Sequence, residues 1–528
     1  MKVFLMYRDR DFHSKQEPPP DQQVLSQEVE RILRMHRDRD LGSKQELPST
    51  QQALIQDLEL GTLFEAMAQG DRFVYGVSRE AVLIGLTDPD RIRYRQEILK
   101  DCLKNPAVVR EIYSIPIQAI ESKRHHWMWI SCSYPSGILN SAIEMLAMFV
   151  ALLKKLRGIA DQHAHRFESE GFGRFFAMIQ EELTDDYFAL MDDHLRRLAF
   201  RSGVLISGKP GKGNEGTDYV LRRPNHQGQP WMKRVTAKRS RVYSFRLDPR
   251  DEHGARALGE FVGRGINLVA NAAAQAADHI DSFFNILYME LAFYVGCMNL
   301  SEQLAQLGEP IAFSEPATAG ERRHSFVGLY DVCLALTMKR QVVGNDVNAD
   351  GKELFVITGA NQGGKSVFLR SVGLAQLMMQ CGMFVPAESF CANVCTGLFT
   401  HYKREEDSSM ESGKFDEELG RMSAIVDKIA PDCMVLFNES FAATNEREGS
   451  EIARQIVTAL LERRIKVLYV THLYELAHGF HKRKTANAIF LRAERQADGT
   501  RTFKLAEGEP LQTSYGQDLY DGIFGEEN

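Results

Sequence analysis

The feature that most constrains the fold of this chain is a short apolar run that leads directly into a glycine-rich loop. Leu354–Thr358 is apolar enough to form a buried strand, the next eight residues read GANQGGKS, and a helical pattern starts near Val367. Glycines in such a loop let consecutive backbone N–H groups approach phosphate oxygens, and the N-terminus of the following helix adds a favourable partial charge. The sequence therefore predicts an α/β domain built around a phosphate-binding loop, the P-loop.

Two residues of this loop carry predictable chemistry. Lys365 would bridge the β- and γ-phosphates of a nucleotide, and Ser366 would ligate Mg²⁺. A second glycine-rich segment, 208–213, contains a proline and is followed by no helical pattern, so we interpret it as a flexible loop. The predicted cofactor-binding residues of the P-loop are Gly359, Asn361, Gly363, Gly364, Lys365 and Ser366.

Two further apolar runs end in residues suited to nucleotide chemistry. After Cys433–Phe437 comes Asn438, where most P-loop enzymes have an aspartate that holds Mg²⁺ through its water shell. The amide oxygen of Asn438 can orient a metal-bound water without a negative charge, and we predict it, together with Ser366, as the metal site. Glu439 is placed to polarise the attacking water. His472 follows the third run, and we predict it as a second catalytic residue, hydrogen-bonded to the γ-phosphate or to that water.

Together these motifs resemble the ATPase domain of the MutS mismatch-repair family. The similarity includes Asn361 and the Gly-Gly-Lys-Ser pattern of the loop, the Asn-Glu strand end and the Thr-His strand end. It covers roughly residues 326–525 and extends more loosely back to about residue 57. The resemblance implies an ABC-type fold, ATP and Mg²⁺ as cofactors, hydrolysis of ATP to ADP and phosphate, and ATP sites shared across a homodimer. It also implies lever helices that carry the nucleotide state to a DNA-embracing clamp.

The resemblance assigns two further cofactor-binding residues. Asn345 lies in the segment that matches the family's adenine-contacting region. Residues 408–415 correspond to the signature loop that reaches the nucleotide of the partner subunit, and Glu418 matches a helix carboxylate beyond it. Gly413 stands where the family usually has a serine, and Ser412 is our candidate for the contact.

The rest of the chain is predicted to be mainly helical. Apolar stripes over about 138–198 and 255–307 predict long packed helices, and the Gly-, Pro- and β-branched-rich segment 203–247 between them predicts a small β insertion. We also expect a short strand at 73–77. The first part of the chain contains a polar segment repeated at an offset of 29 residues, which predicts a surface arm. The predicted domains are an N-terminal arm at 1–56, a helical core and lever at 57–325 and an ATPase domain at 326–528.

The chain as a whole is not a basic nucleic-acid binder, because its 64 basic and 71 acidic residues give a net charge of −7. Any DNA contact must therefore be local. Residues 219–247 contain eight basic residues and no acidic one, interleaved with Trp231 and Tyr243, which favours a phosphate-contacting surface. A solvated loop or a subunit contact explains the same composition equally well. The predicted DNA-binding residues are Arg222, Arg223, Lys233, Arg234, Lys238, Arg239 and Arg241.

Cysteine usage and apolar patterning favour a cytoplasmic protein. The eight cysteines are scattered without a C-x-x-C pair, which is typical of reduced thiols, and the most apolar stretch, Met145–Leu153, is too short to cross a bilayer. Since about sixty residues precede the helical region, we expect no direct mismatch reading. The expected partners are double-stranded or structured DNA, a second copy of the chain and other repair proteins, with no membrane. The alternatives are an ATP-binding switch with little hydrolysis, and a scaffold dimer without direct DNA contact.

Overall fold

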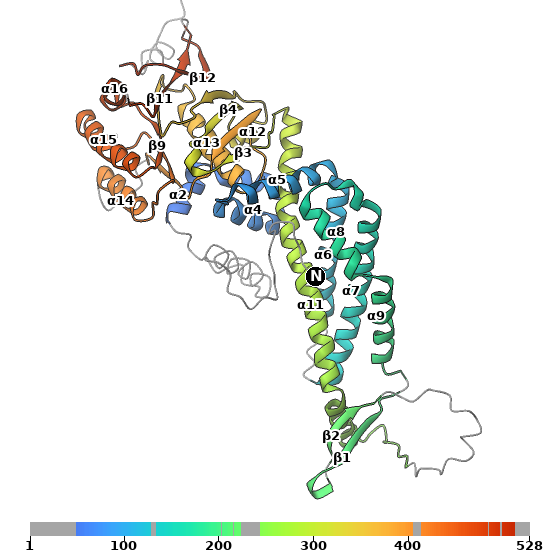
Figure 1. Ribbon diagram of the computed structural model, residues 1–528. Coiled ribbons are helices and arrows are strands. Elements are labelled where there is room, and N and C mark those ends of the chain that lie inside the picture. The colour runs from blue at the N-terminus through green and yellow to red at the C-terminus, as the bar shows by residue number, and fades with distance from the viewer. Residues whose placement is uncertain are drawn as a thin grey trace, which may run out of the picture. The chain divides into compact units, whose positions relative to one another are not determined.

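The computed structural model describes residues 49–127, 134–201, 203–214, 216–222, 243–404, 413–483, 485–496 and 499–512. The chain forms two compact units that alternate along the sequence (Figure 1). The first comprises Arg110–Arg166 and Gly173–Tyr288; the second comprises the described residues before Arg110, Phe167–Phe172 and those from Met289 onward. The predicted domain boundaries after residues 56 and 325 stay predictions, and most of the predicted N-terminal arm lies outside the described residues.

The first unit is built from long helices and a small antiparallel ribbon. Aromatic pairs join its helices: Phe149 packs against Phe284 with ring centroids 5.5 Å apart, and Tyr113 stacks on Tyr288 at 5.2 Å. Helices α6, α8 and α11 also contribute residues to the second unit. The elements are α6 (Pro106–Trp127), α7 (Pro135–His163), α8 (Glu170–Glu182), α9 (Asp185–Leu198), β1 (Ile206–Pro210), β2 (Gly216–Leu221) and α11 (Glu252–Leu307).

The structure corrects three local predictions. Residues 73–77 belong to α4 (Arg72–Ile84), because the side chain of Asp71 caps the first turn by accepting two backbone N–H groups and the buried residues recur at helical spacing. The segment predicted as a loop contributes Gly208–Pro210 to β1, which pairs antiparallel with β2. Residues 243–245, which belong to the predicted β insertion, are exposed and lie outside any strand.

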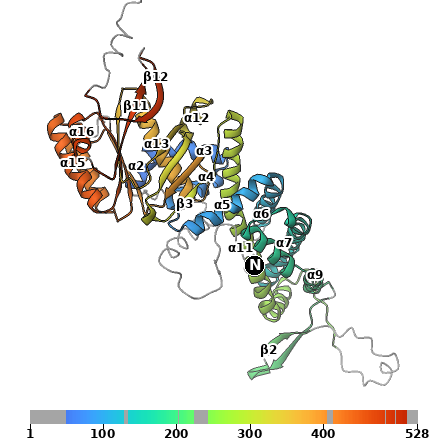
Figure 2. The ribbon, with the colours of Figure 1, turned by 45° about the horizontal axis from the view of Figure 1, so that its top comes forward.

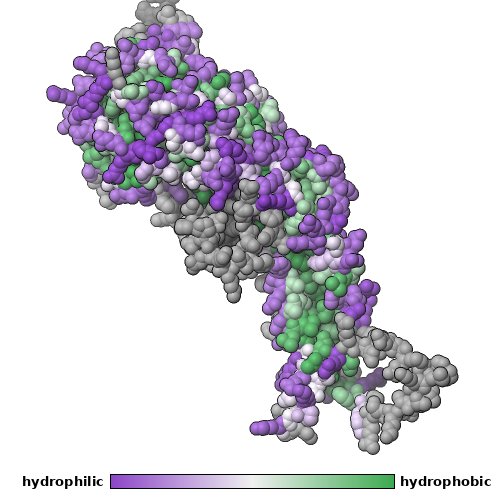
Figure 3. Space-filling view, viewed as in Figure 1, coloured by the Kyte–Doolittle hydropathy of each residue, from purple (hydrophilic) through white to green (hydrophobic). Residues whose placement is uncertain are grey.

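Two helical segments, Pro135–Arg166 and Glu252–Leu307, are long and apolar enough to cross a membrane by length and composition. The first of them contains Met145–Leu153, so the prediction that this apolar region is too short is wrong, because its apolar character continues on both sides. In the most apolar part of each segment, 39% of the residues of the first and 83% of those of the second are buried inside the protein. Figure 3 shows apolar side chains gathered on the surface of the helical unit.

The second unit contains the six-stranded sheet that carries the candidate site. The strand order is β12-β11-β6-β10-β9-β8, and all neighbours are parallel except β11 and β12. These strands are β6 (Leu354–Gly359), β8 (Leu398–Tyr402), β9 (Met434–Asn438), β10 (Lys466–Val470), β11 (Ala488–Arg495) and β12 (Arg501–Glu507). The mixed helical and α/β architecture predicted from the sequence is therefore confirmed.

Helices cover both faces of this sheet, as a mostly parallel sheet requires. Figure 2 shows α13 on one side and α15 with α16 on the other. Helix α14 packs on the same face as α15 and α16, where its side chains join theirs in one apolar cluster. The helices are α13 (Lys365–Gln380), α14 (Lys414–Val426), α15 (Glu446–Glu462) and α16 (Tyr474–Lys482).

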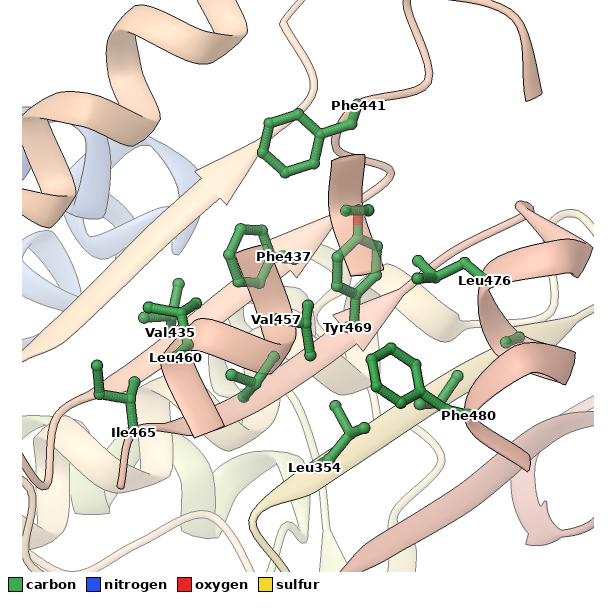
Figure 4. Packing of buried hydrophobic residues seen from close by; sticks show 14 of the residues in the cluster. Leu354, Val435, Phe437, Phe441, Val457, Leu460, Ile465, Tyr469, Leu476 and Phe480 are labelled. Atoms are coloured by element: carbon green, nitrogen blue, oxygen red, sulfur yellow. The ribbon is translucent and has the colours of Figure 1, made fainter. Parts of the chain in front are cut away.

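This apolar cluster holds the central strands in place (Figure 4). Leu354 of β6, Phe437 of β9 and Tyr469 of β10 all contribute buried side chains, and Phe437 stacks on Tyr469 with ring centroids 5.0 Å apart. Full burial of one such side chain stabilises the folded state by roughly 1.5–3 kcal/mol. Because the cluster fixes three adjacent strands, it also fixes the carboxyl ends where the candidate site lies.

A smaller sheet and several helices complete the second unit. Arg370 of α13 donates hydrogen bonds to Asp331 and Glu59, and Asp331 caps α12 by accepting the N–H of Leu334, so the P-loop helix is tied to its neighbours. The sheet order is β3-β7-β4-β5. The elements are α2 (Ser49–Asp57), α3 (Leu60–Ala68), α5 (Pro89–Lys104), β3 (Glu315–Ala317), β4 (His324–Leu329), α12 (Val332–Met338), β5 (Asn345–Asn348) and β7 (Ser389–Asn393).

Candidate nucleotide-binding site

Three predicted motifs meet at the carboxyl ends of adjacent parallel strands. In the register, Val470 of β10 lies between Ile357 of β6 and Asn438 of β9. The backbone continues this pairing past the strand ends, since Thr471 N–H donates to the carbonyl of Ile357 at 3.1 Å and Glu439 N–H donates to that of Val470 at 2.9 Å. This is the position at which open α/β sheets bind ligands.

The loop between β6 and α13 depends on its glycines. Gly359 has a φ of +112°, and a Cβ there would lie 2.8 Å from the backbone nitrogen of Ala493. A Cβ on Gly363 would lie 2.9 Å from the carbonyl oxygen of Ala360, and Gly364 has a φ of +87°. Side chains at Gly359 and Gly363 would clash with β11 or with the loop itself, and one at Gly364 would be strained by its φ, so the loop exposes backbone instead.

Lys365 begins α13 and is almost fully buried, with 5% of its surface exposed. Its ammonium donates hydrogen bonds to the carbonyl oxygens of Gly359 at 3.0 Å and Ala360 at 2.9 Å. Burial lowers the pKa of Lys365, while the nearby carboxylate of Glu439 opposes that shift. The result is a desolvated positive charge at the loop, which interacts strongly with an anion.

Ser366 and Asn438 lie side by side, as the predicted metal site requires. The Ser366 hydroxyl donates to the side-chain oxygen of Asn438 at 3.0 Å. Hydroxyl and amide oxygens are hard ligands, and Mg²⁺ characteristically takes few protein ligands together with phosphate oxygens and water. The donor set therefore fits Mg²⁺ carried in with a nucleotide, although it lacks the usual carboxylate.

Glu439 and His472 form a hydrogen-bonded pair. The two side chains approach to 2.7 Å between Oε1 of Glu439 and Nε2 of His472, and about a third of each remains exposed. The pKa of Glu439 is lowered mainly by the hydrogen bond from His472 and further by the charge of Lys365, against the opposing effect of burial. Glu439 therefore stays ionised at neutral pH, which a base that accepts a proton requires.

A cavity of about 570 Å³ joins the polar residues to an apolar region. Lys365, Ser366 and Glu439 are among its polar lining residues, and Asn438 and His472 are hydrogen-bonded to two of them. Its apolar and aromatic lining side chains include Tyr330, Leu334, Met338, Val342, Val343 and Phe503. A pocket with both kinds of lining suits a ligand that has charged and apolar parts.

Asn345 also lines this cavity, but its side chain is hydrogen-bonded to the backbone of β12. Its amide oxygen accepts the N–H of Leu505 at 2.7 Å, and its amide nitrogen donates to the carbonyl of Phe503 at 3.3 Å. Asn345 is 5% exposed and ties β5 to β12, rather than offering a free amide. Ser412, the other residue taken from the resemblance, lies outside the described residues.

Three residues of the site were missed by reasoning from sequence. Phe503 has a φ of +59°, is 49% exposed and lies 3.6 Å from the position of a Cβ on Gly364. Arg501 donates to the carbonyl of Asn361 at 3.1 Å and so holds the loop from β12. Within the described part of the chain, the buried hydroxyl of Tyr330 has no hydrogen-bond partner. No local signal marks these residues, because distant segments bring them to the loop.

The structure describes one of the predicted DNA-binding residues. Arg222 is exposed at the end of β2 and donates to the hydroxyl of Ser207 at 2.9 Å. Tyr243 is 83% exposed. The remaining predicted residues, Arg223, Lys233, Arg234, Lys238, Arg239 and Arg241, lie outside the described residues.

Comparisons with protein families cover both units of the chain. A family model described as the MutS2 N-terminal domain matches residues 87–307, and one described as MutS domain V matches residues 355–521. The chain belongs to the MutS family. The second match contains the P-loop and the strand ends with Glu439 and His472 of this MutS-family chain, whereas the cavity-lining residues 329–345 precede it.

Three relatives illustrate the range of the family. The chain is 32% identical over 213 residues to the DNA mismatch repair protein MutS of Thermotoga neapolitana, covering 40% of this chain and 26% of that protein. It is 28% identical over 225 residues to Endonuclease MutS2 of Lactobacillus acidophilus, covering 42% and 28%. It is 25% identical over 253 residues to MutS protein homolog 4 of Mus musculus, covering 44% and 26%. The matched part of this MutS-family chain thus spans about a quarter of each relative's length.

Proposed function

We propose that this chain binds ATP with Mg²⁺ in the 570 Å³ cavity and hydrolyses it to ADP and phosphate. The observation that carries the proposal is the convergence of Lys365, Ser366 and Glu439 in a cavity that also has an apolar and aromatic lining. The polar lining (the phosphate end) would bind the triphosphate, and the apolar lining (the base end) would bind the base. The known activities of MutS-family proteins support the same assignment.

Each residue of the polar end has a distinct role in this proposal. The backbone N–H groups of the loop and the ammonium of Lys365 bind phosphate oxygens, and the desolvation of Lys365 strengthens its interaction with them. Ser366 and Asn438 would hold Mg²⁺, which neutralises phosphate charge when bound. Glu439 orients the attacking water and accepts its proton, while the hydrogen bond from His472 keeps the Glu439 carboxylate in place.

A second candidate is a nucleotide switch in which bound ATP changes the protein while hydrolysis is slow. The neutral Ser366–Asn438 pair favours this candidate, because the metal ligand that usually carries a negative charge is an amide here. Both candidates use the same binding cavity. They differ only in whether Glu439 completes the reaction at a useful rate.

We also propose that the chain works as a homodimer on DNA in the cytoplasm. Ser412 would reach the nucleotide of the partner subunit, and the basic segment 219–247 would contact DNA phosphates without reading sequence. Arg222, exposed on the β1–β2 ribbon, is the described member of that surface. A scaffold dimer without direct DNA contact is the alternative to this part of the proposal.

Calorimetric titration with ATP and Mg²⁺, combined with steady-state ATPase assays, tests the nucleotide part. Lys365→Ala should weaken ATP binding about 100-fold, because it removes charge-assisted hydrogen bonds to phosphate. Glu439→Gln should keep the affinity and lower kcat on the order of 100-fold or more. Unchanged affinity in Lys365→Ala contradicts the site itself. Equal ATPase rates in the wild type and in Glu439→Gln would contradict the proposed hydrolysis and favour the nucleotide switch.

Salt-dependent DNA binding tests the other part, using homoduplex, mismatched and branched DNA with and without ATP. Neutralising four basic residues should weaken binding to all three and flatten its salt dependence. No binding of the wild type even at low salt supports the scaffold alternative. The test variant carries glutamine at Arg222, Arg223, Lys238 and Arg239, and the matched control carries it at the exposed residues Lys428, Arg463, Lys482 and Arg483.

A further inference from the structure

The loop that follows β9 has an unusual backbone. Glu439 and Phe441 have φ values of +55° and +61°, in the left-handed region that non-glycine residues rarely adopt. Such a conformation persists only when the surrounding structure fixes it, and it is frequent at functional sites. Since Glu439 is the proposed base, whatever holds this loop also sets the position of that carboxylate.

The contact that holds the loop comes from helix α14. Glu418 is fully buried at 0% exposure, and its Oε2 accepts the backbone N–H of Phe441 at 3.0 Å. In addition, a Cβ on Gly449 would lie 2.3 Å from the carbonyl oxygen of Phe441. The backbone of Phe441 is therefore confined by a carboxylate from α14 at its N–H and by the close approach of α15 at its carbonyl.

The buried side chain of His401 holds Ser440, the residue between Glu439 and Phe441. The ring of His401 stacks on that of Phe441 with centroids 5.1 Å apart, and burial lowers the pKa of His401 to about 4, so the ring is neutral. Its Nε2 lies 2.9 Å from the backbone carbonyl of Glu418, which can only accept, so the single ring proton is on Nε2. Its Nδ1 lies 2.7 Å from the Ser440 hydroxyl, which also donates to the backbone carbonyl of His401, while the Tyr469 hydroxyl donates to the Ser440 carbonyl at 2.7 Å.

We propose that Glu418 is a positioning residue for Glu439: its carboxylate holds the Phe441 N–H and thereby sets the loop that presents the catalytic carboxylate. Glu418 is not among the described residues that line the cavity, so it acts through the backbone two residues beyond Glu439. The inference rests on the proposed ATPase function. A misplaced catalytic group lowers the rate of the chemical step without weakening nucleotide binding, and this distinguishes positioning from a contact with nucleotide.

A purely structural buried carboxylate is available as a matched control. Asp101 of α5 is 2% exposed and accepts the backbone N–H groups of Glu168 at 3.0 Å and Ser169 at 2.7 Å. Like Glu418, Asp101 is a buried carboxylate that accepts backbone N–H groups. Unlike Phe441, its partners Glu168 and Ser169 lie next to no predicted motif. Loss of either carboxylate should lower thermal stability, whereas only loss of Glu418 should affect catalysis.

Kinetic constants of Glu418→Ala, Glu418→Gln and Asp101→Asn test the inference in the full chain. Glu418→Ala should lower kcat about 10- to 100-fold while the ATP affinity measured by calorimetry stays within about twofold. Glu418→Gln retains an acceptor oxygen and should recover part of that loss, and Asp101→Asn should keep the wild-type kcat. An unchanged kcat in Glu418→Ala overturns the inference while leaving the proposed function intact. So does a loss of equal size in Asp101→Asn.

Hydrogen exchange gives a readout that does not need ATP hydrolysis. The amide of Phe441 should exchange at least about tenfold faster in Glu418→Ala, while amides of the apolar cluster, such as Val457, stay protected. Unchanged protection at Phe441 overturns the inference whether or not the wild type is active. If the Phe441 amide exchanges faster in Glu418→Ala but the wild type hydrolyses no ATP, the contact between Glu418 and Phe441 is supported and the proposed ATPase function is rejected. Failure of the inference and failure of the proposed function can therefore be distinguished.

Discussion

In the proposed site, the phosphate end and the base end of the cavity are built in different ways. The phosphate end comes from short contiguous motifs after two strands: Lys365 and Ser366 close the loop after β6, and Glu439 directly follows β9. The base end combines Tyr330, beyond β4, with Phe503 of β12, residues that are far apart in the sequence. The phosphate end therefore depends on local backbone geometry, whereas the base end depends on how the β4–β5 region and β12 are packed together.

The largest effect is expected from a glycine of the phosphate end. Gly359→Ala should lower the free energy of unfolding by about 3 kcal/mol, because it combines an unfavourable φ with a Cβ 2.8 Å from the nitrogen of Ala493. Gly351→Ala is the matched control, since Gly351 also has a positive φ of +76° but open space around its Cβ position, and it should cost only about 1 kcal/mol. Denaturant unfolding measures both. Equal losses would break the claim that close packing shapes the P-loop.

The buried histidine behind the phosphate end should make stability depend on pH. Because burial lowers the pKa of His401 to about 4, the unfolded chain takes up a proton below about pH 6.5 while the folded protein does not. The unfolding free energy should therefore fall by about 1.4 kcal/mol per pH unit between pH 6.5 and about 4, or ~3 kcal/mol in total. His401→Asn should remove this part of the slope. Parallel pH profiles of the two proteins would show that His401 titrates normally in the folded state.

A smaller effect is expected at the base end. Phe503→Ala should weaken ATP binding about tenfold, because stacking of a base on an aromatic ring contributes about 1–3 kcal/mol. Binding of inorganic triphosphate, which reports the phosphate end alone, should not change. Phe503→Tyr retains the ring and should bind ATP normally. A parallel loss for both ligands would mean that Phe503 supports the loop instead of the base.

The smallest effect is expected at the metal ligand. Asn438→Asp restores a negative charge beside Ser366 and should strengthen Mg²⁺ binding by about 1 kcal/mol, which corresponds to a fivefold lower Mg²⁺ concentration for half-maximal activity. Asn348→Asp on β5 adds the same charge in the smaller sheet and serves as the control. An unchanged Mg²⁺ requirement would place the metal away from residue 438.

Local sequence was enough to predict the position of a polar residue that directly follows an apolar strand. The strand preceding the P-loop and the strand ends at Glu439 and His472 were predicted from apolar runs, and the register places them together. Local sequence failed at residues 73–77, where the Asp71 cap and the helical spacing of buried residues outweigh strand propensity. The nucleotide contact of Asn345, which was taken from the family resemblance, stays a prediction; its amide binds the backbone of β12.

The residues proposed for the phosphate end could be recognised in the sequence alone, because glycines, a lysine and strand-end polar residues act through their immediate neighbours in the chain. The base end and the contacts that hold the Glu439 loop, in contrast, arise from tertiary packing. Phe503, Glu418 and His401 acquire their roles from contacts across 17 or more positions in the sequence, such as the bond between His401 and Glu418. Such contacts depend on how helices and strands pack in three dimensions, and no local pattern of residues specifies that packing.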